Sequence, residues 1–271
     1  MFIDSHCHLN FPDFQEHMPD VLQEMADAQV SGALCISTTL ETFNDVHTLA
    51  VQHPQLWATV GVHPDNEGVQ EPTLQDLLDG AARPRVVGIG ETGLDYYRLG
   101  ERTVADMEWQ RERFRTHIRA GRQTDLPLVI HTRNASDDTL AILKEEGGFD
   151  ATGQTLPLSR GVFHCFTETM AVAKAALDLG FFISFSGILT FKNAADLREV
   201  AAYVPLERCL IETDSPYLAP MPHRGKTNTP AYVPFVAQQL AALKGVSVET
   251  VAQATRENFA RLFNQTGLPV H

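Results

Sequence analysis

Eight short apolar runs alternate with longer amphipathic stretches along the chain, and this alternation restricts the fold more than any other feature. The runs are rich in Val, Ile and Phe, and most are bounded by Gly or Pro, as expected for buried strands. They lie at Phe2–Ser5, Ala33–Ser37, Trp57–Val62, Val86–Glu91, Leu128–Thr132, Val162–Phe166, Phe182–Ser186 and Cys209–Thr213. Eight strands that alternate with helices over 271 residues predict an α/β fold, the (β/α)8 TIM barrel.

The stretches between these runs carry apolar residues at helical spacing. They are Pro19–Gln29, Val104–Arg122, Ala135–Glu146, Ala171–Leu179, Ala194–Tyr203, Tyr232–Leu243 and Val248–Phe263. No repeat or long linker interrupts the pattern, so we expect a single domain over residues 1–271. The rival fold, a doubly wound open sheet, usually has GxGxxG after its first strand. Here HCHLNFPDF follows the first run, and no helix follows the glycines of VGIGETG at 87–93.

Charge and composition exclude several classes of protein. The chain has 21 Lys and Arg against 34 Asp and Glu, a net charge of −13, which argues against coating nucleic acid by general electrostatic attraction. A local, metal-charged pocket that binds one phosphate stays compatible with this charge. No apolar run reaches the roughly 18 residues of a membrane helix, and MFIDSHCH lacks a signal-peptide pattern. We therefore expect a cytoplasmic protein with no membrane contact.

Four cysteines, Cys7, Cys35, Cys165 and Cys209, all fall inside short apolar runs, and none forms a CxxC pair. We interpret them as buried small hydrophobic residues in a reducing compartment rather than as ligands of a structural zinc.

Histidines gather at the carboxyl ends of the predicted strands, where the catalytic residues of TIM barrels lie. Five of the eleven histidines occupy such ends, namely His6, His8, His63, His131 and His164. If strand ends make up roughly a tenth of a barrel, about one would be expected there by chance. Side chains alternate along a strand, so His6 and His8 point the same way and can share one metal.

Two carboxylates also stand at strand ends: Glu91 ends the fourth run, and Asp214 directly follows the eighth. With four histidines they make six candidate metal ligands: His6, His8, Glu91, His131, His164 and Asp214. These nitrogen and oxygen donors suit Zn²⁺, Mn²⁺, Fe²⁺, Co²⁺ or Ni²⁺. Because six protein ligands exceed one tetrahedral site, we predict two metal ions about 3.5–4 Å apart that share one bridging carboxylate.

Other polar residues at this edge allow two interpretations each. His63 either contacts the substrate or braces the mouth of the barrel. Asp95, Arg133 and Glu212 either orient metal ligands or form salt bridges at the rim. For Asp4, deeper in the first strand, we expect a buried hydrogen bond rather than catalysis.

The segment Asp214–Lys226 after the last run is rich in proline and carries two cations, Arg224 and Lys226. Loops after strands 7 and 8 of TIM barrels often bind phosphate. An arginine can bind phosphate with two parallel hydrogen bonds, and a lysine offers a point charge. We expect phosphate contact here; the alternative is a rigid surface loop with ordinary cations.

Several motifs together resemble the TatD family of metal-dependent deoxyribonucleases, within the wider amidohydrolase-like group of barrels. The motifs are DSHCHLN, VGVHP, GIGETGLDYY, PLVIHTR, HCFTE, FFISFSGILTFKNA, LIETDSPYLAP and PHRGK. The resemblance runs from Phe2 to about Phe263. Two departures are visible: Asn134 stands where the family pattern has Asp, and Gly147–Ser159 is longer than usual.

The resemblance implies how the candidate ligands divide between two metals. His6, His8, Glu91 and Asp214 would hold one ion, and Glu91, His131 and His164 the other, with Glu91 bridging. It also implies Mg²⁺ as the working metal, with Zn²⁺, Mn²⁺, Co²⁺ or Ni²⁺ as alternatives, and DNA phosphodiesters as the substrate, often cleaved 3′ to 5′.

From these features we predict a metal-dependent hydrolase that acts on the 3′ end of single-stranded DNA. Its catalytic residues would be Glu91 and Asp214, with Asp214 as general base for a metal-activated water. The substrate contacts would be His63, Arg133, Arg224 and Lys226. A narrow metal-charged mouth can accept one strand end although the acidic surface repels a long duplex. Nothing in the sequence marks an interface between subunits, so we expect a monomer.

Three other functions fit the same residues. The ligand set could hydrolyse a D-aminoacyl-tRNA ester, or a small lactone, amide or phosphotriester. In a third case the chain binds nucleic acid without catalysis and the metal only stabilises the barrel. The third function is disfavoured because structural metal sites are usually fully coordinated by Cys and His. The candidate ligands here include carboxylates and all lie at the open end of the barrel.

Overall fold

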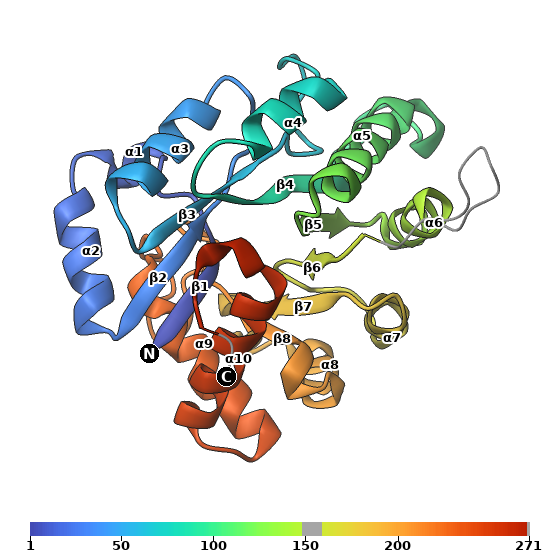
Figure 1. Cartoon of the computed structure of the whole chain (residues 1–271). Coiled ribbons are helices and arrows are strands. Elements are labelled where there is room, and N and C mark those ends of the chain that lie inside the picture. Colours follow the sequence, from blue (N-terminus) through green and yellow to red (C-terminus); the bar gives the residue numbers. More distant parts are fainter. Residues whose placement is uncertain (148–158, 270–271) are drawn as a thin grey trace.

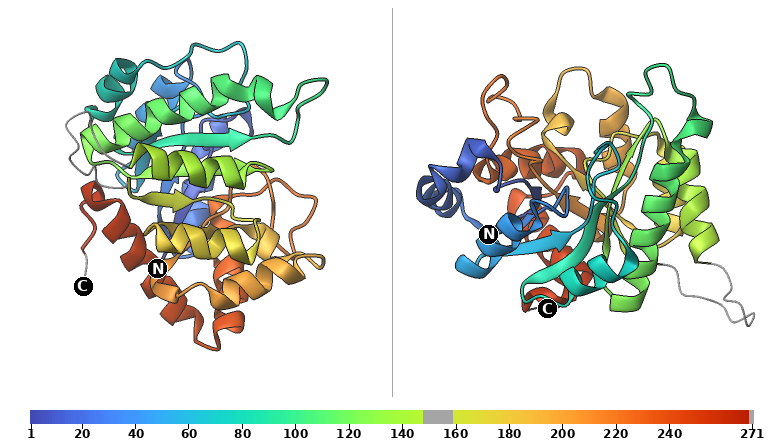
Figure 2. Two further views of the ribbon diagram at one scale, coloured as in Figure 1. Left: turned by 90° about the vertical axis from the view of Figure 1, so that its right-hand side faces the viewer. Right: turned by 90° about the horizontal axis from the view of Figure 1, so that it is seen from above.

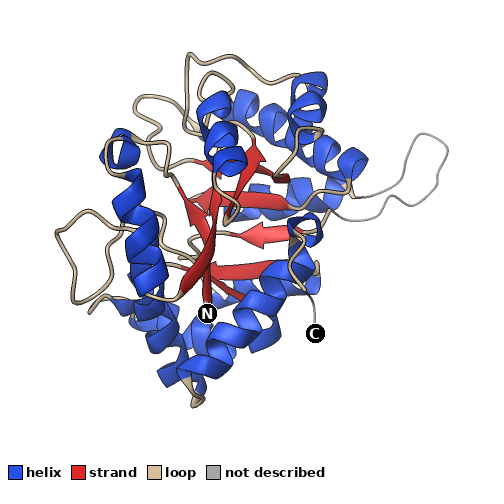
Figure 3. Ribbon diagram, turned by 60° about the vertical axis from the view of Figure 1, so that its left-hand side comes forward, coloured by secondary structure: helices blue, strands red, loops and turns tan. Residues whose placement is uncertain are grey.

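The computed structural model describes residues 1–147 and 159–269, and its strands form one sheet of eight parallel strands that curves into a barrel (Figure 1, Figure 3). The order in the sheet follows the order in the chain, which confirms the predicted (β/α)8 TIM barrel. The strands are β1 (Phe2–Cys7), β2 (Val30–Cys35), β3 (Leu56–Val60), β4 (Val86–Asp95), β5 (Leu128–Arg133), β6 (Gly161–Phe163), β7 (Phe182–Phe185) and β8 (Cys209–Ile211).

Helices lie around the outside of this barrel (Figure 1). They are α1 (Pro12–Gln15), α2 (Met18–Asp27), α3 (Phe43–Gln52), α4 (Leu74–Ala81), α5 (Glu108–Thr124), α6 (Ser136–Glu146), α7 (Met170–Asp178), α8 (Ala195–Tyr203), α9 (Val233–Lys244) and α10 (Val248–Leu262). The seven predicted helical stretches correspond to α2 and to α5–α10, except that α5 is preceded by a short 3₁₀ turn, Val104–Met107.

Three helices, α1, α3 and α4, were not predicted from the sequence. The start of α4 does carry a signal, because Thr73 and Asp76 form a capping box across its first turn. The start of α3 has the same spacing, with Thr42 and Asp45, but there Thr42 makes no side-chain cap hydrogen bond.

Strand ends differ from the predicted runs by up to four residues, and two of the differences affect the mouth of the barrel. β4 continues to Asp95, four residues beyond Glu91, and pairs there with the end of β5. β6 ends at Phe163 because Cys165, with a φ of 42°, leaves extended geometry. His164 therefore lies just past its strand, at the start of a loop.

The barrel closes between β1 and β8 mainly through side chains. The carboxylate of Asp4 accepts hydrogen bonds from the backbone N–H and the hydroxyl of Thr213, and Ser5 donates to the carbonyl of Ile211. Burial raises the pKa of Asp4 to about 8. Near the mouth, the N–H of Asp214 donates to the carbonyl of His6. The expected buried hydrogen bond of Asp4 is thus confirmed.

The amino-terminal end of the barrel is filled by α10. Phe259 and Phe263 pack there with inward side chains of the strands, including Ile3 and Val129. The left view of Figure 2 shows α10 at this end, and the loops that follow the strands emerge at the other. The carboxyl end is therefore the open end, where the candidate ligands lie. Among the described residues, no helix has the length and apolar character to cross a membrane.

Candidate metal centre at the open end of the barrel

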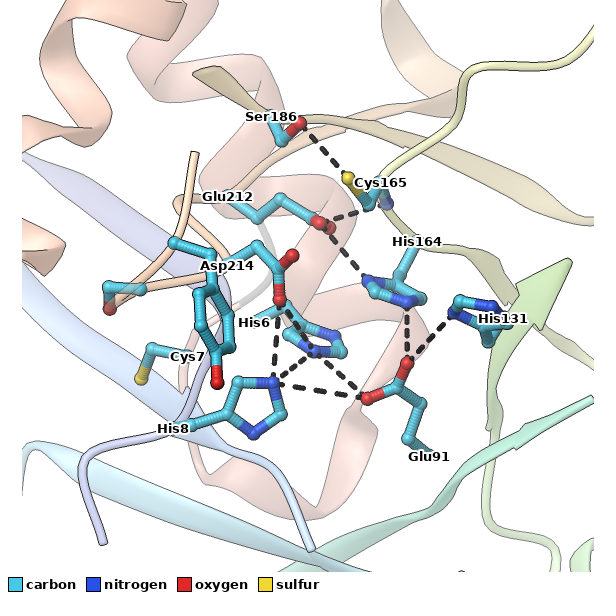
Figure 4. A network of polar contacts seen from close by, with 12 residues as sticks. His6, Cys7, His8, Glu91, His131, His164, Cys165, Ser186, Glu212 and Asp214 are labelled. Carbon is cyan, nitrogen blue, oxygen red and sulfur yellow. Dashed lines mark hydrogen bonds and ion pairs between the residues drawn. The ribbon is translucent and has the colours of Figure 1, made fainter. Parts of the chain in front are cut away.

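The six predicted ligands and His63 come together around one buried carboxylate, that of Glu91. They come from six strands or from the residues just after them, since the carboxyl ends of parallel strands share one edge of the barrel. Figure 4 shows this cluster: His6 and His8 from the β1 end, Glu91 from β4, His131 from β5, His164 after β6 and Asp214 after β8. His63 follows β3.

One oxygen of Glu91, Oε2, faces a first group of donor atoms. It lies 3.4 Å from His6 Nε2 and 3.9 Å from His8 Nε2. The two imidazole nitrogens are 3.3 Å apart, and Asp214 Oδ1 lies 3.5 Å from His6 Nε2 and 3.4 Å from His8 Nε2. The predicted common direction of His6 and His8 is thus confirmed.

The other oxygen, Glu91 Oε1, faces a second group. It lies 2.8 Å from His164 Nε2, 3.2 Å from His131 Nδ1 and 3.3 Å from His63 Nε2. His63, expected either to contact substrate or to brace the mouth, is therefore also in reach of the carboxylate.

The donor atoms of the first group have the spacing of metal ligands. Four ligands in a tetrahedron around an ion at about 2.0–2.1 Å lie about 3.4 Å from one another. The distances of His6 Nε2 and His8 Nε2 to each other, to Glu91 Oε2 and to Asp214 Oδ1 run from 3.3 to 3.9 Å. In the second group, the imidazole nitrogens of His63, His131 and His164 all converge on one oxygen of Glu91, Oε1, at 2.8 to 3.3 Å. The residues present therefore fit divalent metal ions on both sides of Glu91.

Two further carboxylates hold histidines of the second group from behind. Asp95 Oδ2 lies 2.9 Å from His131 Nε2, and Glu212 Oε1 lies 3.2 Å from His164 Nδ1. A carboxylate on the far nitrogen fixes the tautomer and direction of an imidazole that binds a metal. Of the two interpretations of Asp95 and Glu212, the structure thus favours orientation of ligands over rim salt bridges.

The electrostatic balance of the cluster keeps its two central carboxylates ionised. Burial alone raises the pKa of Glu91, but the neighbouring His164, His63 and His6 outweigh it and hold that pKa well below its usual range. For Asp214, burial is likewise outweighed, chiefly by the hydrogen bond to His8, and its pKa is lowered. Both groups are therefore anionic and can attract cations near neutral pH.

The cluster forms the floor of a cavity of about 650 Å³. Of the predicted substrate contacts, His63 and Arg133 line this cavity. Arg224 and Lys226 are exposed and are not among its lining residues; the guanidinium of Arg224 lies 3.8 Å from the centre of the Phe191 ring. The geometry thus brings one of the three predicted cations to the cavity.

Sequence reasoning missed several residues of the cavity wall, among them Phe11, Arg98 and Tyr217. They lie in the loops after β1, β4 and β8, and only their position after a strand end could have indicated them. Cys165 also lines the cavity and is half-buried, so its assignment as a buried hydrophobic residue was wrong. The cause is the left-handed backbone at Cys165, which places it in a loop; the other three cysteines are buried as expected.

Of the two departures from the family pattern, Asn134 takes no part in this cluster. Asn134 is exposed and has a φ of 54°, a conformation that asparagine adopts more readily than most residues. Most of the longer stretch Gly147–Ser159, namely residues 148–158, lies outside the described residues.

Comparison with known proteins connects this geometry to a family. The family model described as TatD related DNase matches residues 3–264. The chain is 48% identical over 266 residues to the metal-dependent hydrolase YcfH of Escherichia coli K12, covering 97% of this chain and 95% of that protein. It is 32% identical over 266 residues to a protein of Shigella flexneri named 3′-5′ ssDNA/RNA exonuclease TatD, covering 96% and 98%. The crystal structure of YjjV, a TatD homologue from E. coli K12, superimposes with a TM-score of 0.87 at 31% identity, covering 99% of this chain and 98% of that chain.

Proposed function

The chain belongs to the TatD-related DNase family and is a metal-dependent hydrolase, and on that premise we propose that it removes nucleotides from the 3′ end of single-stranded DNA. The name of the Shigella relative supports a nucleic-acid substrate, although that name covers RNA as well. The YcfH relative, which is closer in sequence, is named only as a metal-dependent hydrolase. The choice of phosphodiester and of DNA is therefore our proposal, argued from the site.

The observation that carries this proposal is the position of Glu91 between two groups of ligands, one on each of its oxygens. We propose that His6, His8, Glu91 and Asp214 hold one divalent ion and that Glu91, His131 and His164 hold a second. Two such ions would bind a phosphoryl oxygen and lower the pKa of a bound water, the chemistry that phosphodiester hydrolysis needs. Mg²⁺ is the proposed working metal; the carboxylates also suit Mn²⁺, and the five imidazoles around the site suit Zn²⁺.

Within this site Asp214 is the residue proposed to accept the proton of the attacking water. Its side chain is 17% exposed, whereas that of Glu91 is 3% exposed and has both oxygens surrounded by histidines. Asp214 also lines the cavity and stays ionised, so it can meet a water there in its basic form. Glu91 is proposed to position the centre rather than to move the proton.

The shape and charge of the cavity support attack at a strand end. Arg133 at the rim can hold a phosphate as negative charge develops, while the chain as a whole carries a net charge of −13. A duplex lying across this acidic molecule would be repelled, but one end of a single strand can reach the floor. Arg224 and Lys226, which do not line the cavity, would contact only a longer stretch of the same strand.

The test begins with protein stripped of metal. Mg²⁺, Mn²⁺ and Zn²⁺ are titrated back separately while 5′-labelled linear, 3′-labelled linear and circular single-stranded DNA are followed. We expect metal-dependent, stepwise shortening of the 5′-labelled strand, early release of the 3′ label and no cleavage of the circle. Single-stranded RNA of the same sequence measures the preference for DNA.

Two variants serve as controls for this experiment. His131→Ala removes a proposed ligand and should abolish activity, whereas His17→Ala removes an exposed histidine between α1 and α2, outside the cavity lining, and should not. Cleavage of circular DNA at the linear rate would refute the need for an end. If no metal supports cleavage of DNA or RNA, the nuclease proposal fails, and charged D-aminoacyl-tRNA and neutral small esters become the substrates to examine.

A further inference from the structure

We propose that Phe11 and Tyr217 form an aromatic wall on which a nucleobase of the substrate stacks beside the metal centre. The inference rests on the proposed function, because it names how the same site would recognise a nucleotide. It concerns side chains that take no part in the metal cluster and that were not among the predicted substrate contacts.

The two rings stand together at one side of the cavity. Their centroids are 6.3 Å apart with planes at 76°, and Phe11 in turn stacks on the imidazole of His8, with centroids 4.8 Å apart. Both rings line the cavity, next to the partly buried aliphatic side chains of Ile188 and Leu218. Through His8 the aromatic wall directly adjoins the first group of ligands.

Tyr217 remains 56% exposed although its backbone is held firmly. The fully buried Asn228 donates from its side-chain amide to the carbonyls of Thr213 and Tyr217, and its own N–H donates to the carbonyl of Pro216. The N–H of Tyr217 donates to the carbonyl of Asp214. The segment that carries Asp214, the proposed general base, thus also holds the exposed ring of Tyr217 three residues further on. Because this backbone is already ordered, stacking of a nucleobase would cost little conformational entropy.

The opposite side of the cavity carries positive charge. Two arginines line it there: Arg98 lies in the loop after β4, and Arg133 is the last residue of β5. These strands lie across the barrel from β8 and β1, which precede Tyr217 and Phe11. The loops after β4 and β8 both project from the open end in the right view of Figure 2. The cavity therefore has an aromatic side, a floor of metal-type ligands and a cationic side.

A nucleotide matches this division better than a small neutral ester does. Its base offers a flat π-face to the aromatic wall, its phosphate reaches the floor, and the next phosphate of a strand reaches the arginines. Stacking of a base on an aromatic side chain is tolerant of sequence and is worth roughly 1–3 kcal/mol, or about 5- to 150-fold in affinity. The aromatic wall would thus support binding to any terminal base.

The test measures binding rather than turnover, so that it can be judged apart from the nuclease activity. Calorimetry with Mn²⁺ present compares 2′-deoxyadenosine 5′-monophosphate with 2-deoxyribose 5-phosphate, which lacks the base, on the wild-type protein and on variants. Tyr217→Ala removes the ring and Tyr217→Phe keeps it. Tyr203→Ala is the matched control, because Tyr203 is 50% exposed but lies on α8, outside the cavity lining.

We expect the nucleotide to bind the wild-type protein about 5- to 150-fold more tightly than the sugar phosphate. In Tyr217→Ala this ratio of affinities should fall to about two or less. In Tyr217→Phe and Tyr203→Ala it should stay at the wild-type value. A wild-type ratio near one, no nucleotide binding, or a ratio that survives Tyr217→Ala would overturn the aromatic wall. A protein that shows the expected ratios but cleaves no DNA would retain the wall and reject the exonuclease.

Discussion

The contact between Asp95 and His131 allows a single-atom test of the metal centre. Asp95 Oδ1 accepts the backbone N–H of Tyr97 at 2.8 Å, and Oδ2 lies 2.9 Å from His131 Nε2. In Asp95→Asn, the Tyr97 N–H keeps the amide oxygen on its own side, so the amide NH₂ must face His131 Nε2. The imidazole then has to accept at Nε2 and carry its proton on Nδ1.

That tautomer is the wrong one for the proposed role of His131. Nδ1 is the nitrogen that lies 3.2 Å from Glu91 Oε1, and a protonated Nδ1 cannot bind a metal. Replacement of such an orienting carboxylate typically costs 10- to 100-fold in metal affinity. We therefore expect metal binding in Asp95→Asn to weaken by about 1.4–2.7 kcal/mol.

Isothermal titration of metal-free protein with Mn²⁺ or Zn²⁺ measures this loss directly. Asp138→Asn is the matched control, since Asp138 accepts a hydrogen bond from Tyr96 but does not contact the histidine cluster. Glu212→Gln gives an internal comparison: one oxygen, Oε1, faces both His164 Nδ1 and the N–H of Cys165, so the amide can keep its accepting atom in place. Its effect should be smaller. Wild-type metal affinity in Asp95→Asn would refute the argument.

Two further predictions concern stability. Burial lowers the pKa of His117 from 6.5 to about 4, so the unfolded chain binds more protons between these values, and the free energy of unfolding should fall by up to about 3 kcal/mol as pH drops from 6.5 to 4. Denaturant titrations at several pH values in this window give the free energy of unfolding as a function of pH. This free energy should fall less steeply with decreasing pH in His117→Gln than in the wild type, and an equal pH dependence would contradict the assignment. Gly93 has a φ of 129° and an added Cβ would overlap the carbonyl oxygen of His131, so Gly93→Ala should lower the free energy of unfolding by about 2–4 kcal/mol. Gly225→Ala, also at positive φ but in open space, should cost about 1 kcal/mol, and equal losses in the two variants would show that the overlap is relieved.

The fold was largely predictable because its signals are local. The eight apolar runs reflect strands that are buried on both faces, and the helical stretches reflect amphipathic periods of a few residues. α3 and α4 were missed because they are short, with 10 and 8 residues, so each shows only two to three turns of the helical period. Strand ends were less predictable, since the left-handed turn at Cys165 is imposed by its surroundings and not by a glycine.

The candidate site likewise has a part that the sequence predicted and a part that it did not. His6, His8, Glu91, His131, His164 and Asp214 could be selected because each stands at a strand end and has ligand chemistry, and a parallel barrel must gather such residues at one edge. Which of the three cations lines the cavity could not be predicted from position after a strand in this way. Each guanidinium lies over an aromatic ring, Arg133 over Tyr97 and Arg224 over Phe191, but only Arg133 also lines the cavity, and this difference depends on how the loops fold over the rim.

The sequence by itself therefore determined the barrel, the edge that carries the chemistry and the residue types that converge there, because period, strand order and side-chain chemistry are properties of the local chain. Only the tertiary structure decided which oxygen of Glu91 faces which histidines, that Asp95 and Glu212 stand behind two of them, and that Phe11 and Tyr217 meet across the seam of β1 and β8. Those relations join residues up to about 200 positions apart. Their distances are set by the packing of the whole barrel, and no short segment of the chain encodes them.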